Sequence, residues 1–127
     1  MPMKNLLVRK LRECEEFIAG DGSILREFLH PAKQDLKLRY SLALAKVMPG
    51  KVTKPHKLKT SEVYYIISGR GEMHIGNKSF KVGPDTTIYI PPHSAQYIRN
   101  TGKTVLKFIC IVDPAWRKAD EEIIGIK

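Results

Sequence analysis

From residue 38 onward, glycine and proline turns divide the sequence into short runs of strand-forming residues, and this pattern most constrains the fold. The runs include LRYSLALAKV, EVYYIISG, TTIYI and VLKFICIV, and turn segments such as MPG, GNK, GPD and PPHSA separate them. Valine, isoleucine, tyrosine and phenylalanine favour strands, whereas glycine, proline and asparagine mark turns. Several strands of roughly five to eight residues at this spacing predict an all-β sandwich or barrel.

The two ends of the chain follow a different pattern. Residues 16–19 are predicted to form a strand, residues 20–22 a turn, and the segment after them a second strand or a short helix. The C-terminal segment, residues 113–127, is predicted to be a cap whose single helical turn packs Trp116 onto the barrel. A length of 127 residues suits one domain. We therefore expect a single domain over residues 1–127, with short irregular or helical flanks packed on the barrel.

The net charge of +9 is the most unusual property of the composition. Lysines and arginines are spread from Lys4 to Lys127 without a zinc-finger, helix-turn-helix or RNA-binding motif, which indicates a solvated basic surface and no specific nucleic-acid partner. No apolar run approaches the ~18 residues that a membrane span needs. The start of the chain has no signal-peptide pattern, so we expect a cytoplasmic protein. Two cysteines make no disulfide framework.

The segment EVYYIISGRGEMHI is predicted to form a hairpin around a Gly69–Arg70 turn. In that register Ile66 pairs with Met73, and partners across a hairpin share a face. One face then carries Glu62 and an apolar set that marks it as the inside: Tyr64, Ile66, Met73 and Ile75. The other face carries Val63, Tyr65 and Ile67, an apolar outer surface from which we expect a homodimer. A buried Glu62 needs a partner, because an uncompensated buried acid is costly.

Two spaced blocks of residues carry the candidate chemistry. The first reads Gly50, five residues, His56, one residue, Leu58, three residues, Glu62, six residues, Gly69. Strand alternation lets Lys54 and His56 point with Leu58 into the cavity. The second block runs from Gly83 to Asn100 and includes His93 and Gln96, with Gln96 on a strand that returns past the first block.

These two blocks resemble the two motifs of the cupin superfamily, over about residues 38–112, and the chain is similar to small cupins of the cupin 2 type. The resemblance implies a jelly-roll β-barrel, also called a double-stranded β-helix. It also implies a metal site of three histidines and one glutamate. Carried over by position, His56 and Glu62 are present, but Leu58 and Gln96 replace two histidines, and His93 stands at the glycine of the second motif.

Three interpretations of this site remain open. In the first, His56, Glu62 and Gln96 hold a divalent metal (Fe, Mn, Ni or Zn), and His93 completes the set if its loop folds inward. In the second, His56 and Glu62 form a buried hydrogen-bonded cluster with Gln96 and Tyr64. In the third, a metal-free site grips an anionic or hydroxylated small molecule, with ligand-binding residues Lys54, His56, Tyr64, His93 and Gln96.

The functional hypotheses follow from these interpretations. One is a metal-dependent enzyme acting on a carbohydrate, sugar phosphate or small carboxylate, in which Tyr64 or Lys54 is catalytic by positioning or protonating the substrate. The alternative is a non-catalytic ligand-binding or sensing cupin that has lost its metal. A third is a structural dimer without a ligand. The fold by itself selects no reaction.

Overall fold

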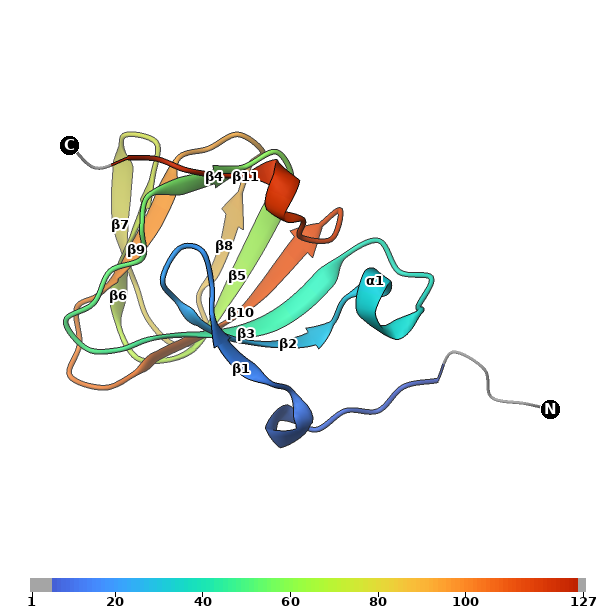
Figure 1. The fold of residues 1–127 in the computed structure, drawn as a ribbon. Coiled ribbons are helices and arrows are strands. Elements are labelled where there is room, and N and C mark those ends of the chain that lie inside the picture. The colour runs from blue at the N-terminus through green and yellow to red at the C-terminus, as the bar shows by residue number, and fades with distance from the viewer. Residues whose placement is uncertain (1–5, 126–127) are drawn as a thin grey trace.

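Residues 6–125 are described by the computed structural model, and they fold into two antiparallel β-sheets that enclose a common core (Figure 1). The larger sheet has the order β1 (Glu16–Ile18), β2 (Ile24–Leu29), β3 (Ser41–Val47), β10 (Leu106–Asp113), β5 (Ser61–Ser68) and β8 (Thr87–Ile90). The smaller sheet has the order β11 (Glu121–Ile123), β4 (His56–Leu58), β9 (Gln96–Asn100), β6 (Gly71–Ile75) and β7 (Lys78–Val82). The predicted all-β barrel is confirmed.

The helical segments in this part of the chain are short. They are α1 (Pro31–Gln34) and the 3₁₀ turns η1 (Leu11–Glu13) and η2 (Lys118–Asp120). None of the helices within residues 6–125 has the length and apolar character that crossing a bilayer requires.

The core lies between the sheets, where alternate side chains of each strand meet. Ile66 on β5 is opposite Phe108 on β10, and both are almost completely buried. The Phe108 ring packs against Tyr64 with 4.4 Å between the ring centroids. Burying one such side chain stabilises the fold by about 1.5–3 kcal/mol. This apolar layer closes one end of the barrel and leaves the other end for a cavity.

The predicted pairing around Gly69 is wrong, although the predicted faces are right. β5 pairs with β10 and β8, whereas β6 pairs with β7 and β9, so the two segments lie in different sheets. The Gly69 turn (φ 91°) crosses between the sheets, and a Cβ there would lie 2.7 Å from the Leu106 Cα. Ile66 and Met73 nevertheless both point inward, because alternation within each strand is local and the core lies between the sheets.

The flanking segments complete the open end of the barrel. β1 and β2 form a hairpin at the edge of the larger sheet; the first strand and the turn were predicted, and the segment after them is the strand of the two alternatives. At the C-terminus, η2 is the expected helical turn, but β11 was not predicted, because its Glu-Glu sequence has low strand propensity. β11 forms by pairing with β4, with Glu121 opposite Leu58 and Ile123 opposite His56. In Figure 1 this red segment lies beside green β4.

Candidate functional site

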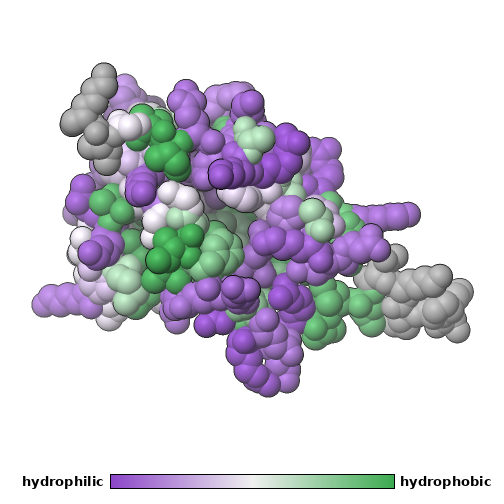
Figure 2. All heavy atoms as spheres, viewed as in Figure 1, coloured by the Kyte–Doolittle hydropathy of each residue, from purple (hydrophilic) through white to green (hydrophobic). Residues whose placement is uncertain are grey.

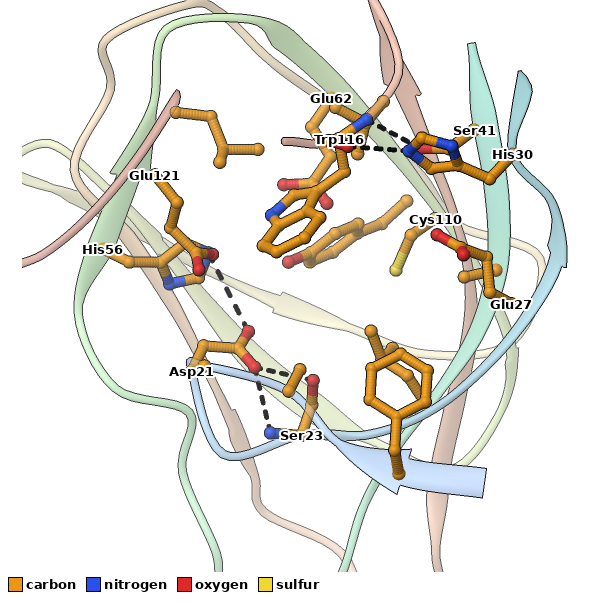
Figure 3. Close-up of a pocket in the computed structure, with 18 of the residues that line it drawn as sticks. Asp21, Ser23, Glu27, His30, Ser41, His56, Glu62, Cys110, Trp116 and Glu121 are labelled. Atoms are coloured by element: carbon orange, nitrogen blue, oxygen red, sulfur yellow. Dashed lines mark hydrogen bonds and ion pairs between the residues drawn. The ribbon is translucent and has the colours of Figure 1, made fainter. Parts of the chain in front are cut away.

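A cavity of about 450 Å³ opens between the β1–β2 hairpin, the C-terminal segment and the inner faces of both sheets. Figure 2 shows apolar side chains beside the hollow on this face, within a mainly hydrophilic surface. Much of the lining is apolar and includes Phe17, Leu25, Ala43, Leu58, Phe108, Val112 and Trp116. Polar side chains gather in two places, one around His56 and one around His30 (Figure 3).

His56, on β4, is held in one orientation. Its side chain is 3% exposed, and Nδ1 lies 2.8 Å from the carbonyl oxygen of Lys54. A carbonyl only accepts, so Nδ1–H donates, and when the ring is neutral Nε2 is left as an acceptor. Nε2 faces Asp21 Oδ2 at 3.8 Å, which is too long for a hydrogen bond. The other Asp21 oxygen accepts hydrogen bonds from the backbone N and Oγ of Ser23.

A chain of hydrogen bonds connects Tyr64, Gln96 and Glu62. The Tyr64 hydroxyl donates to Gln96 Oε1 over 3.2 Å, and Gln96 Nε2 donates to Glu62 Oε1 over 3.2 Å. Gln96 also lies opposite His56 in the β4–β9 register. The structure therefore brings His56, Glu62, Gln96 and Tyr64 together. Glu62 and Tyr64 line the cavity, while Gln96 is fully buried behind them.

The cavity strongly perturbs the ionisation of Glu62. Its pKa is raised from 4.5 to about 8, mainly by burial and in addition by the nearby Asp21 and Glu121 carboxylates, against the lowering effect of the Gln96 hydrogen bond. Burial, followed by the charge of Glu62, also raises the pKa of Tyr64 well above its usual range. Glu62 is therefore protonated at neutral pH, and Tyr64 keeps its proton as a hydrogen-bond donor.

Asp21 and Glu121 are site residues that sequence reasoning missed. Asp21 lies in the β1–β2 turn and Glu121 at the start of β11. The turn approaches β11 closely, since a Cβ at Gly20 would lie 2.8 Å from Glu121 Oε1. Burial raises the pKa of Glu121, which nearby His56 lowers and Asp21 raises. The Gly-Asp-Gly sequence predicted a turn at Asp21, but it did not indicate that this turn would lie beside Glu121.

A second polar group fixes Trp116 over the cavity. The His30 side chain accepts from the backbone N of Ala32, so its other nitrogen, Nε2, donates to the Trp116 carbonyl over 2.8 Å. The Trp116 backbone N donates to Ser41 Oγ over 3.0 Å. Figure 3 shows the indole ring among the cavity residues. The sequence predicted packing of Trp116 on the barrel but did not predict these contacts.

Lys54 and His93 lie outside the cavity. The expectation that Lys54 points inward is wrong: it precedes β4, its side chain is exposed, and its neighbour Thr53 is buried instead. His93 occupies a tight turn with a φ of 66°, where its backbone N donates to the Leu58 carbonyl. This turn leaves the His93 side chain exposed, and the loop does not fold inward.

The residues at the predicted metal position do not fit the metal that the resemblance implies. Leu58, 3% exposed, places an apolar side chain in the cavity wall where a histidine ligand is required. The Gln96 amide already makes two hydrogen bonds, since its oxygen accepts from Tyr64 and its nitrogen donates to Glu62. Within residues 6–125, no three His, Cys, Asp or Glu side chains are grouped so as to hold a metal ion. His56 and Glu62 alone are too few donors for a stable site.

The basic surface does not extend into the cavity. Four acidic side chains line it, Asp21, Glu27, Glu62 and Glu121, together with His30, His56 and Lys33. The Lys33 ammonium pairs with Glu27 at 2.6 Å. The anionic ligand of the third interpretation would therefore meet little positive charge in the cavity lining, because the described lysines and arginines lie mainly on the outside.

The sequence of this chain is similar to a known protein family and to known proteins. A family model described as a cupin domain matches residues 43–112. An uncharacterised protein of Methanocaldococcus jannaschii is 44% identical over 113 residues, covering 88% of this chain and 90% of that protein. Glucose-6-phosphate isomerase of Thermococcus onnurineus is 29% identical over 136 residues, covering 87% of this chain and 71% of the isomerase.

Solved structures share the fold at low sequence identity. The polyketide cyclase RemF from Streptomyces resistomycificus superposes with a TM-score of 0.80 at 16% identity, covering 96% of this chain and 87% of the cyclase. Oxalate decarboxylase of Bacillus subtilis, described with Mn(II) centres, superposes with a TM-score of 0.76 at 23% identity. That match covers 90% of this chain but 31% of the decarboxylase, so this chain spans about a third of that enzyme.

Proposed function

The chain belongs to the cupin family, and from this premise we propose that it is a small-molecule-binding cupin that works without a metal. The observation that carries the proposal is the hydrogen bond from Gln96 to Glu62. In the family pattern these positions hold two ligands of one metal. Here the two side chains are hydrogen-bonded to each other, and Leu58 stands where the family pattern has a further histidine ligand.

The cavity supports a binding function over a purely structural one. Its volume of about 450 Å³ falls within the ~300–1,000 Å³ of typical small-molecule sites. Apolar walls with a few convergent polar groups are also typical of such sites. The acidic side chains of the lining favour a neutral or cationic ligand over a sugar phosphate or a carboxylate, because an anion would face Asp21 and Glu121.

Proton transfer is a second candidate function, which the pKa of Glu62 favours. A carboxyl group with a pKa of about 8 is close to neutral pH, where general acids and bases are most effective. His56 Nε2 is an acceptor in the same cavity. Such a pair could isomerise a neutral carbohydrate without a metal. This candidate is tested by incubating the protein with neutral sugars in deuterated water and measuring deuterium uptake by NMR. We expect uptake with the unchanged protein and none with His56→Gln.

Metal content tests the main proposal. The protein is purified without a metal-affinity tag, and its iron, manganese, nickel and zinc are measured. We expect less than about 0.1 ion per chain and no rise in melting temperature on adding these ions, since ligands of the folded state raise it by mass action. One ion per chain that disappears in His56→Ala would support the metal-dependent alternative and contradict the proposal.

A further inference from the structure

We infer that the ligand of this cavity is an organic cation, a primary ammonium group on an apolar body, with the ammonium among Asp21, His56 and Glu121. The inference rests on the proposed binding function and specifies its ligand class. It follows from the hydrogen-bonding capacity, the charge and the shape of the cavity.

The polar end of the cavity offers acceptors and few donors. His56 Nε2, Asp21 Oδ2 and the Glu121 carboxylate face the same space (Figure 3). The neighbouring donors are already used, because His56 Nδ1–H bonds to a backbone carbonyl, Gln96 Nε2 bonds to Glu62, and the Trp116 side chain bonds to Glu121. An ammonium group carries three N–H donors and no acceptor. It therefore complements three acceptors, which one hydroxyl could not do.

The unpartnered nitrogen of His56 points independently to a missing donor. The side chain is 3% exposed, yet within residues 6–125 Nε2 has no hydrogen bond, its nearest polar partner being Asp21 Oδ2 at 3.8 Å. His56 lines the cavity, so a ligand can reach this nitrogen, and an acceptor without a hydrogen bond favours a ligand that brings a donor. A ligand N–H placed between His56 and Asp21 would satisfy both groups.

The charges at this end of the cavity also lack compensation. Asp21 and Glu121 face one histidine, and the one lysine in the described lining, Lys33, is paired with Glu27. Burial is the main cause of the raised pKa values of Glu62 and Glu121, and repulsion from the Asp21 carboxylate adds to both. A bound cation would supply the missing positive charge, whereas a bound anion would add to the repulsion.

The remaining walls fit an apolar body. Trp116 lies over the cavity, fixed by hydrogen bonds of its backbone to His30 and Ser41. Phe17 and Phe108 also line the cavity. Fixed aromatic side chains favour a flat apolar group on the ligand. The cavity therefore joins an aromatic-lined wall to an acceptor-rich end.

Three probes that share one skeleton test the inference at pH 7: 2-phenylethylammonium (cationic), 2-phenylethanol (neutral) and 3-phenylpropanoate (anionic). Trp116 is the single tryptophan, so its fluorescence reports occupancy, and the melting temperature gives a second readout. We expect the cation to bind about tenfold tighter than the alcohol, in line with charge-assisted hydrogen bonds. We expect the propanoate to bind weakest.

Two variants locate the cation. Glu121→Gln and Asp21→Asn should each remove most of the preference for the cation over the alcohol, and the amide introduced by Asp21→Asn keeps an oxygen that can accept from Ser23. Glu122→Gln is the matched control, because Glu122 is exposed on the same strand as Glu121 and does not line the cavity. It should leave the preference unchanged. Melting temperatures without probe verify that each variant is folded.

The probe measurements test the cation assignment independently of the proposed metal-free function. Equal or tighter binding of the alcohol or the propanoate overturns the cation assignment and leaves metal-free binding intact. No binding of any probe at millimolar concentration also overturns the assignment. The metal measurements decide the proposed function on their own, so its failure is recognised by a stoichiometric metal, whatever the probes do.

Discussion

Gln96 Nε2 donates a hydrogen bond over 3.2 Å to Glu62 Oε1, and the two side chains reach each other from opposite sheets of the barrel. In a cupin metal site the corresponding histidine and glutamate bind one ion. Here the two side chains bond directly to each other, and Gln96 also accepts a hydrogen bond from the Tyr64 hydroxyl. The barrel keeps the positions of the site while its chemistry has changed.

Restoring the histidines should restore a metal site. The double variant Leu58→His and Gln96→His places two imidazoles beside His56 and Glu62, the donor set that the family pattern requires. We expect it to bind about one divalent ion per chain and to melt at a higher temperature with manganese or zinc. Elemental analysis and thermal denaturation provide the measurements.

Leu58→His alone is the control for this experiment, since Gln96 would still be bonded to Glu62. It should bind metal much more weakly than the double variant. If the double variant also stays free of metal, the positions no longer converge on one point, and the interpretation of Leu58 and Gln96 as lost ligands is wrong.

The ionisation of Glu62 should make stability depend on pH. Its pKa is about 8 in the folded protein against 4.5 ordinarily, so within this range the folded state holds a proton that the unfolded chain has lost. The free energy of unfolding should therefore fall as pH rises through this range, by roughly 1 kcal/mol per pH unit. Glu62→Gln mimics the protonated form and should remove this part of the fall.

Urea denaturation at several pH values between 5 and 8 measures this effect as the difference between Glu62→Gln and the unchanged protein. The difference should grow with pH in favour of the variant. For Glu122→Gln, which changes an exposed glutamate, the difference in unfolding free energy from the unchanged protein should not vary with pH. A constant difference for Glu62→Gln as well would mean that Glu62 is ionised in the folded protein.

Two adjacent tyrosines offer a matched test of the buried hydrogen-bond chain. Tyr64→Phe removes the buried donor to Gln96 and should cost about 1 kcal/mol or more of unfolding free energy. Tyr65→Phe removes a 2.7 Å hydrogen bond to Asp85 at the surface and should cost less than about 0.5 kcal/mol. Denaturant titration of both variants gives the comparison. Equal costs would show that the Tyr64–Gln96 bond contributes nothing beyond a surface contact.

The outer face of β5 should mediate self-association. Val63, Tyr65 and Ile67 point away from the core, and Tyr65 and Ile67 are exposed. We expect a homodimer that the pair Val63→Lys and Ile67→Lys dissociates, as measured by sedimentation velocity. Ser79→Lys, on exposed β7 of the other sheet, is the control and should leave the dimer intact. A monomeric unchanged protein would contradict this prediction.

Features that depend on local spacing were predictable from the sequence. Strand alternation assigned Glu62, Tyr64 and Ile66 to the inside and Tyr65 to the outside, and the structure agrees. The resemblance to the cupin motifs implied that His56, Glu62 and Gln96 are neighbours, although His56 and Glu62 lie on strands of different sheets. Such inferences succeed because the side-chain period of a strand is set by its own backbone.

The partners of these residues depended on the tertiary structure. Glycine turns allow either a hairpin or a crossing between sheets, so the sequence could not reveal that Gly69 joins two sheets. Asp21 and Glu121 reach His56 from the β1–β2 turn and from β11, which forms only by pairing with β4. Long-range packing thus decided that, in a protein with charge +9, acidic side chains outnumber lysine and arginine in the cavity lining. The sequence by itself determined the barrel and the loss of the metal ligands, and the fold decided what took their place.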